Sequence, residues 1–464
     1  MSFIFYDILI FIAFCIFIVF FLYARRKNVD REGILFLYRT KAGLNAIDVL
    51  NRKLGKLWKK LGPVIIFAGF VFMISIFVLL IQSIIFTYMV PTKVPPIIPL
   101  VPYLPQAFDI PMPPFYFTYW ILIIAIIAVT HEFAHGIYAR HHGIKVKSTG
   151  FGFLGPFLLA FVEPDEKQMA KKPKKSQLEI LAAGSFSNFV FAIIFVLLMQ
   201  LFFVCAYQPA GIAYSQAYTG INTSGISSIG NLSTDAFFNM SDSELKAINE
   251  TLEVKTENGS YWLTPEIIKE IPFMRKAIIK NSIITAYEDS PAFRANLSGG
   301  LLEIDGKKIK NPEDVGKILS ESAPGQEMNV KTSSGNYKIT LAENALNSSK
   351  GYLGIGFASS GGGIRGFLSK CTSPFFSDNV SVKPKINESV ATFFSDLFIW
   401  LILICFFVAL FNMLPVGFLD GGKFMYLSAL IVTKSKKKAG VVFRVMSYIV
   451  AIVFVFLILA WLFA

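Results

Sequence analysis

All four histidines of the 464-residue chain lie in one short stretch, residues 128–143, which reads AVTHEFAHGIYARHHG. Within it His131, Glu132 and His135 form an HExxH sequence directly after an apolar run. On a helix, residues four apart share a face, so both imidazoles can bind one metal ion. Glu132 lies one step round the helix, where its carboxylate can hold a water on the metal and take its proton. The pattern indicates a zinc site with an open coordination position, as catalytic zinc requires.

A catalytic zinc needs a third protein ligand, and the nearest candidate in the sequence is His141. It follows His131 by ten residues, the spacing of the HExxHxxGxxH sequence of soluble zincins. That sequence needs a glycine to turn the chain so that the last histidine returns to the metal, and here the position holds Tyr138. Without the turn His141 is a poor ligand, and a basic His-His pair at a helix end fits the membrane interface better.

The second candidate is Asp420, in the sequence NMLPVGFLDGG of residues 412–422. Pro415 and Gly417 break an apolar span there, which frees backbone groups and lets one carboxylate project inward. The HExxH span also ends on the cytoplasmic side, so Asp420 and the two histidines are expected at the same depth. An Asp-Gly turn at the membrane boundary would explain Asp420 by itself, but it would not explain this shared depth. The residues favour Asp420 and leave His141 as the alternative.

The composition excludes an ordinary soluble domain, because 54% of the residues are hydrophobic and only 16% are charged. The net charge of +13 does not indicate nucleic-acid binding, since the lysines and arginines cluster beside apolar spans and are better explained by membrane topology. The predicted fold class is a polytopic α-helical membrane protein with about six transmembrane helices and an inserted α+β domain. The predicted spans are Phe3–Tyr23, Val64–Met89, Phe115–Arg140, Leu178–Tyr207, Ala391–Leu414 and Val441–Ala464.

The basic clusters predict the orientation of the spans, with both termini outside. Residues 24–62 are expected to form a basic helix on the cytoplasmic membrane surface, or alternatively a solvated basic loop. Residues 208–390 are then extracytoplasmic, and all nine N-x-S/T sequences of this segment agree with an exposed, glycosylated surface. A Ser/Thr-rich composition by itself is the alternative explanation. The nine asparagines are Asn222, Asn231, Asn239, Asn249, Asn258, Asn296, Asn347, Asn379 and Asn387.

Two stretches predict structure that is not a membrane helix. Residues 150–162, GFGFLGPFLLAFV, are too short and too rich in Gly and Pro to span, so we expect a re-entrant hairpin shielded by protein. Residues 278–358 contain short β-rich runs (283–287, 301–304, 328–332, 337–341) around one helix, which Asn311 and Pro312 begin. Their order resembles a PDZ domain, and an unrelated β-rich domain is the alternative.

The chain is therefore expected to divide into six segments. They are a first span with the basic segment (1–62), a membrane core (63–207), an extracytoplasmic segment (208–277), the PDZ-like domain (278–358), an extracytoplasmic linker (359–390) and a second part of the membrane core (391–464).

Four sequences together carry a family resemblance: HEFAHG (131–136), the hairpin (150–164), AGSFSN (183–188) and NMLPVGFLDGG (412–422). With the PDZ-like insert between the last two, the arrangement resembles the site-2 protease family of intramembrane zinc metalloproteases. The resemblance implies one catalytic zinc ion bound by His131, His135 and Asp420, with Glu132 as the base. It also implies that Asn188 and Asn412 stabilise the oxyanion or position the substrate. An asparagine in a span equally forms a helix–helix hydrogen bond.

The expected function is hydrolysis of peptide bonds within or next to transmembrane segments of membrane-protein substrates, in an integral membrane protein of the cell membrane. A strand containing Gly150, Gly152 and Pro156 would pair with the unwound substrate. The PDZ-like domain would act as a gate or capture a peptide C-terminus. The alternative is a non-enzymatic zinc-binding receptor or transporter with a PDZ-type ectodomain, which would tolerate the loss of Glu132. The expected partners are transmembrane proteins and the lipid bilayer, with no nucleic acid.

Overall fold

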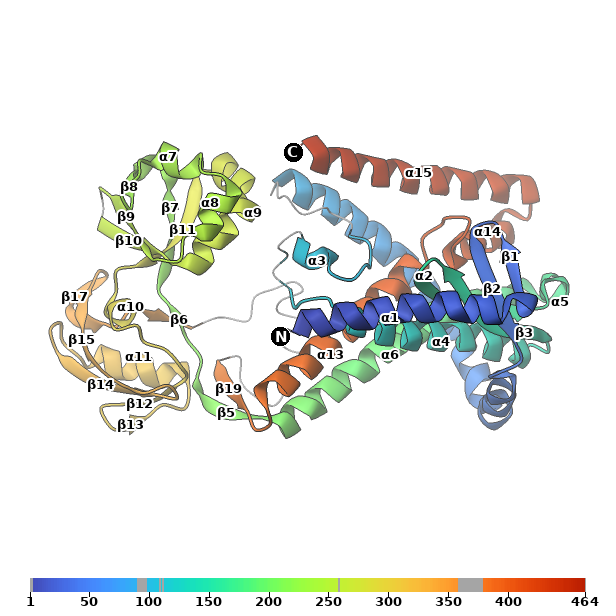
Figure 1. Cartoon of the computed structure of the whole chain (residues 1–464), viewed down its shortest axis with the longest axis horizontal. Helices are drawn as coiled ribbons and strands as arrows, with labels where there is room; N and C mark the ends of the chain where they lie inside the picture. The colour runs from blue at the N-terminus through green and yellow to red at the C-terminus, as the bar shows by residue number, and fades with distance from the viewer. Residues whose placement is uncertain are drawn as a thin grey trace. The chain divides into compact units, whose positions relative to one another are not determined.

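A computed structural model describes residues 3–89, 98–107, 110, 112–257, 259–357 and 379–463. The chain forms two compact units (Figure 1). The first, here called the helical unit, is formed mainly by residues 3–195 and 396–463, and the second mainly by residues 196–395.

Within the described residues, six helices are long and apolar enough to cross a membrane. This confirms the six predicted spans and makes the chain an integral membrane protein, although Ala464 lies outside the described residues. Large apolar side chains such as Phe17 and Phe20 are 58% and 68% exposed, a surface that suits lipid better than water. The six helices are α1 (Phe3–Ala24), α2 (Leu44–Met89), α4 (Phe117–His141), α6 (Lys174–Ala206), α13 (Glu388–Phe411) and α15 (Lys436–Phe463).

Three shorter helices complete the helical unit: α3 (Leu104–Ala107), α5 (Glu166–Lys171) and α14 (Asp420–Thr433). The core lies where α2, α4, α6, α14 and α15 meet. Gly69 of α2 allows a close approach, because a Cβ there would lie 3.0 Å from both Ala182 of α6 and Phe424 of α14. Small residues at such contacts let membrane helices pack tightly.

An antiparallel sheet with the order β1-β2-β3-β4 lies against the helical core. Its strands are β1 (Val29–Glu32), β2 (Leu35–Thr40), β3 (Val146–Leu154) and β4 (Phe157–Pro164). The predicted hairpin within residues 150–164 is thus present as β3 and β4. Packing requires a glycine at position 150, because a Cβ there would lie 2.3 Å from the Tyr38 carbonyl oxygen and 2.4 Å from the Phe161 ring.

The prediction of a surface helix over residues 24–62 is wrong for its first half. After a 3-10 turn (Arg26–Asn28), the chain forms the β1–β2 hairpin, whose turn begins at Gly33 with φ +64°. From Leu44 onwards the segment is helical, and non-helical backbone at Leu54 makes a kink between its first part and the helix of the second span. The basic residues that dominate this part of the sequence do not indicate strands. The hairpin is stabilised instead by the pairing of β2 with β3, more than 100 residues later in the chain.

A buried acid in the first span connects α1 to the helix that carries HExxH. Asp7 is 1% exposed, and its carboxylate accepts hydrogen bonds from the backbone N–H groups of Phe117 (2.8 Å) and Thr118 (2.9 Å). The Tyr103 hydroxyl (2.6 Å) and the Thr118 hydroxyl also donate to it. The first N–H groups of a helix have no partner within the helix, and a carboxylate there also faces the positive end of the helix dipole. Asp7 therefore caps α4 from another helix.

We expect Asp7→Ala to destabilise the helical unit by several kcal/mol, because each buried donor left without a partner costs about 1–3 kcal/mol. Thermal unfolding in detergent measures the effect. Tyr103→Phe removes one of the four donors and serves as the graded control, with a smaller loss. An Asp7→Ala protein that unfolds at the parent's midpoint would show that the cap contributes nothing.

The second unit contains a five-stranded sheet of order β7-β11-β10-β9-β8, covered by three helices. Its separate core includes Phe237, Leu245, Val254 and Leu263, all 0% exposed. Ser241 and Glu244 form the capping box at the start of α8. The elements are β7 (Tyr218–Asn222), a 3-10 turn (Thr223–Gly225), β8 (Ile226–Ile229), α7 (Thr234–Phe238), α8 (Asp242–Ala247), β9 (Leu252–Thr256), β10 (Gly259–Leu263), α9 (Pro265–Asn281) and β11 (Ile283–Glu288).

A second sheet of the same unit has the order β15-β14-β12-β5-β19, with β13 beside β12. The Asn311 side chain caps α11 as expected, accepting from the Asp314 N–H at 2.9 Å. The elements are β5 (Tyr207–Ile212), α10 (Pro291–Arg294), β12 (Leu301–Ile304), β13 (Lys307–Lys308), α11 (Pro312–Ser320), β14 (Glu327–Thr332), β15 (Asn336–Thr340) and β19 (Val380–Pro384). Two short pairs, β6 (Ser215–Gln216) with β18 (Ile355–Gly356) and β16 (Ala342–Asn344) with β17 (Asn347–Tyr352), complete it.

The four strands predicted for residues 278–358 are all present, but one belongs to a different sheet. The predicted strand 283–287 is β11, which pairs with β7 and β10 of the five-stranded sheet. Alternation of apolar residues indicates that a strand exists, but it does not identify the neighbouring strand. Residues 358–378, most of the predicted linker, lie outside the described residues.

Candidate metal centre

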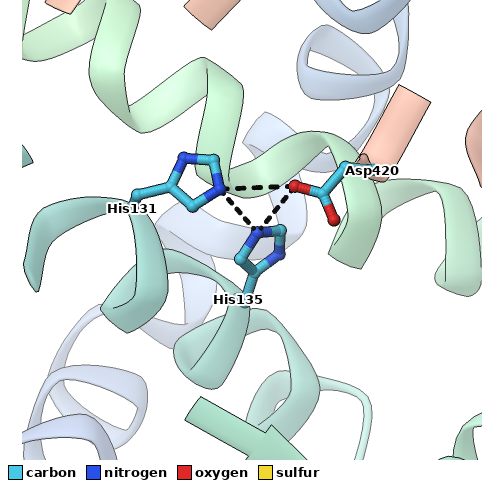
Figure 2. Close-up of side chains that lie close together, drawn as sticks. All are labelled: His131, His135 and Asp420. Atoms are coloured by element: carbon cyan, nitrogen blue, oxygen red, sulfur yellow. Dashed lines mark hydrogen bonds and ion pairs between the residues drawn. The ribbon is translucent and has the colours of Figure 1, made fainter. Parts of the chain in front are cut away.

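Three side chains from two distant segments converge in the helical unit (Figure 2). His131 and His135 project from α4 one helical turn apart and are 8% and 9% exposed. Asp420 is the first residue of α14, and its Oδ2 lies 3.3 Å from Nε2 of His131 and 3.2 Å from Nε2 of His135. The two Nε2 atoms are 3.1 Å apart.

These separations fit a zinc ion. In a regular tetrahedron with bonds of about 2.0–2.1 Å, the ligand atoms lie about 3.3 Å from one another. Two imidazole nitrogens and one carboxylate oxygen are also ligands that zinc prefers, and they leave one of four positions open. The donor set and its spacing therefore fit a metal ion such as zinc with one open position.

A glycine keeps the space between the ligands free. A Cβ on Gly184 of α6 would lie 2.4 Å from Nε2 of His135 and 2.6 Å from Nε2 of His131. Any side chain at this position would clash with both imidazole rings. The sequence analysis used AGSFSN as a motif but did not predict Gly184 as a site residue. The role of this glycine depends on the approach of α6 to α4, which is a matter of tertiary packing.

The loop before Asp420 explains why two glycines follow it. α13 ends at Phe411, and the chain turns back so that the Gly421 N–H donates to the Asn412 carbonyl oxygen at 2.8 Å. A Cβ on Gly421 would lie 2.2 Å from the Met413 carbonyl carbon, and one on Gly422 would lie 2.2 Å from the Val416 carbonyl oxygen. The tight loop thus requires both glycines and places the Asp420 carboxylate beside the histidines.

Both histidines have a second contact that fixes the ring. Nδ1 of His135 donates to the Ile180 carbonyl oxygen at 2.7 Å, so its Nε2 carries the lone pair that faces the other ligands. The Asn188 amide, 0% exposed, lies 3.1 Å from Nδ1 of His131, and its Oδ1 has no partner among the described residues. When the Asn188 amide is turned so that its Oδ1 faces the His131 ring, Nδ1 of His131 donates to it. Nε2 of His131 then carries the lone pair that faces the other ligands, as in His135. This contact suggests that Asn188 orients a ligand.

Glu132 is held beside the metal ligands by the hairpin. Its Oε2 accepts a hydrogen bond of 2.9 Å from the Val162 N–H of β4. Because β3 pairs with β2 on one side and β4 on the other, Gly150 and Gly152 of β3 have no free edge for a substrate strand, and Pro156 lies in the turn. Of the two hairpin strands, β4 is the outer one in the described sheet, and its Val162 contacts Glu132.

The remaining candidates lie away from the cluster. His141 is the last residue of α4, ten residues from His131 and therefore about 15 Å along the helix. Its ring contacts Tyr138 and His142. Asn412 takes part through its backbone carbonyl, which holds the loop before Asp420. The oxyanion roles of Asn188 and Asn412 stay predictions.

Comparison with known proteins gives the family. Residues 119–459 match the model of "Peptidase family M50", a region that includes HExxH, Gly184, Asn188 and Asp420. The chain is also 31% identical over 196 residues to an uncharacterized protein of Methanocaldococcus jannaschii, an alignment that covers 39% of this chain and 48% of that relative. The chain thus spans about half the length of this curated relative. Since the family match covers most of the chain, the protein belongs to peptidase family M50, the site-2 protease family, whose members are zinc-dependent membrane metalloproteases.

Proposed function

We propose that this protein is an intramembrane zinc metalloprotease that cleaves transmembrane proteins within or next to their spans. The observation that carries the proposal is the convergence of His131, His135 and Asp420 beside Glu132 in a unit built from membrane helices. A bound zinc would polarise the substrate carbonyl and make a water molecule more acidic. Glu132 takes the proton of the attacking water and delivers it to the leaving amine. Ile180 and Asn188 hold the ligand rings in place.

The substrate has to unwind before this reaction, because the peptide bonds of a helix are tied up in hydrogen bonds to residues four apart. Apart from the Val162 N–H, which donates to Glu132, the outer edge of β4 offers backbone groups to an extended segment, which would add to the sheet as a further strand. β4 packs along α4, so a strand paired there runs beside Glu132.

The test is cleavage of single-span membrane peptides by the purified protein in detergent. We expect cleavage to stop on treatment with a chelator and to return on addition of zinc. Zinc-loaded protein that cleaves no peptide of the panel would contradict the proposal and favour a non-enzymatic zinc-binding receptor or transporter.

We further propose that residues 208–390 are extracytoplasmic and that the metal centre opens toward the cytoplasm. Of the nine sequon asparagines, Asn258 lies outside the described residues and Asn379 is half-buried, while the others are exposed. Exposed sequons are available for glycosylation where the cell provides it. Protease protection in sealed vesicles tests the orientation, and digestion of this segment from the cytoplasmic side would contradict it.

The PDZ-like part has a groove in which we propose that a peptide C-terminus binds. The cavity of about 300 Å³ lies between α11, with Gly316 and Leu319, and residues 350–355. Lys350 provides a positive charge for a carboxylate. Tyr352, another lining residue, donates its hydroxyl hydrogen to Glu288 at 2.6 Å, so this hydrogen is not available to the peptide.

A labelled peptide is expected to bind this groove when its C-terminus is free and at least about tenfold more weakly when it is amidated, since a charge-assisted hydrogen bond is lost. Gly316→Leu should block binding without disturbing the domain, because a Cβ at Gly316 meets no atom within 4 Å. Equal binding of both peptides would contradict the proposal.

A further inference from the structure

A cavity of about 180 Å³ lies against Glu132. One wall is the loop after β2, with Ala42 and Gly43, and a second is α4, with Glu132 and Phe133. The third is formed by β3 and β4, including Phe161. The cavity therefore adjoins Glu132, the base in the proposed reaction.

The lining of this cavity suits an apolar group. Glu132 is the one charged residue among those that line it. The Thr149 hydroxyl, another polar group of the lining, already donates to the Ala42 carbonyl oxygen. The cavity volume is about six times the roughly 30 Å³ that one water molecule takes in the liquid. Each water in a protein needs two to four polar partners, and the lining of this cavity offers few of them. An apolar cavity of about 150 Å³ holds a molecule as large as benzene.

The chemistry of Glu132 indicates which substrate residue lies closest to the cavity. After bond cleavage its carboxylate gives a proton to the leaving nitrogen, so that nitrogen has to lie within about 3 Å of the carboxylate. The nitrogen belongs to the residue immediately C-terminal to the cleaved bond. The side chain of this residue is attached to the Cα that is bonded to the leaving nitrogen. It is therefore the substrate side chain nearest to Glu132.

We propose that this cavity receives the side chain of the residue immediately C-terminal to the cleaved bond and selects a medium-sized apolar residue there. The inference rests on the proposed function and deepens it. The loop wall, residues 40–43, lies before the region of the family match, which begins at residue 119. Gly43 has φ +84°, and a Cβ there would lie 2.8 Å from the Phe133 ring, so only glycine lets the loop approach this closely.

The test uses substrates that differ only at this residue, with Ala, Leu or Phe, after the cleaved bond has been located by mass spectrometry. The parent is expected to prefer Leu over Ala in kcat/KM by at least about tenfold, since one methylene in an apolar pocket changes kcat/KM by about 10–200-fold. Ala42→Leu enlarges a residue of the lining and should lower this Leu-to-Ala ratio by at least about tenfold. Phe161→Leu enlarges the cavity and should shift the preference toward Phe.

The matched control is Ala46→Leu, the same exchange at an exposed residue of α2 that does not line the cavity, and it should leave the ratio at the parent's value. Thermal unfolding and zinc content show whether each variant is folded. If Ala42→Leu does not fold, Phe161→Leu decides the question. Cleavage with the same ratio in the folded variants overturns this inference and leaves the proposed function standing. A parent that cleaves none of the substrates overturns both.

Discussion

Replacement of Glu132 by Gln is expected to lower cleavage by at least about 10²–10⁴-fold while zinc stays bound, because general acid–base catalysis contributes about that much. Gln keeps the shape of the side chain and an oxygen that accepts from the Val162 N–H, but it cannot take a proton from water. The measurement is kcat/KM on a single-span peptide together with the zinc content of the same preparation.

Glu163→Gln is the matched control. It makes the same exchange one residue beyond Val162, at a side chain that accepts from Ser148 and lies 3.4 Å from Arg39, away from the metal ligands. This variant should retain cleavage. If Glu132→Gln cleaved within tenfold of the parent, another group would be the base and the proposed mechanism would be wrong.

The second large effect concerns the third ligand. Asp420→Ala is expected to lower zinc affinity by more than about 100-fold and to abolish cleavage, since loss of an outer-shell partner alone costs about 10–100-fold. His141→Ala should leave zinc binding unchanged, because His141 lies at the far end of α4. Competition with a chromogenic chelator measures both affinities. The opposite order, with zinc lost in His141→Ala and kept in Asp420→Ala, would show that the centre is a soluble-type zincin site.

The sequence by itself determined the parts that depend on neighbouring residues. The spacing of His131 and His135 on one helix face, the six apolar spans and the Asn311 cap are all local. Local hydrogen bonds and the helical repeat decide these features, so short sequence windows are sufficient to predict them.

Only the tertiary structure decided which distant segments meet. His131 and Asp420 are separated by 289 residues, and the motif resemblance anticipated their contact where spacing alone left His141 open. The cap on α4 comes from Asp7, 110 residues before Phe117, and the strands of residues 29–40 join a hairpin more than 100 residues later. Gly184 has a function because α6 passes across the two histidines. Such contacts follow from the packing of helices and the pairing of strands, whose partners no local pattern specifies, because the same apolar face or strand edge suits many neighbours.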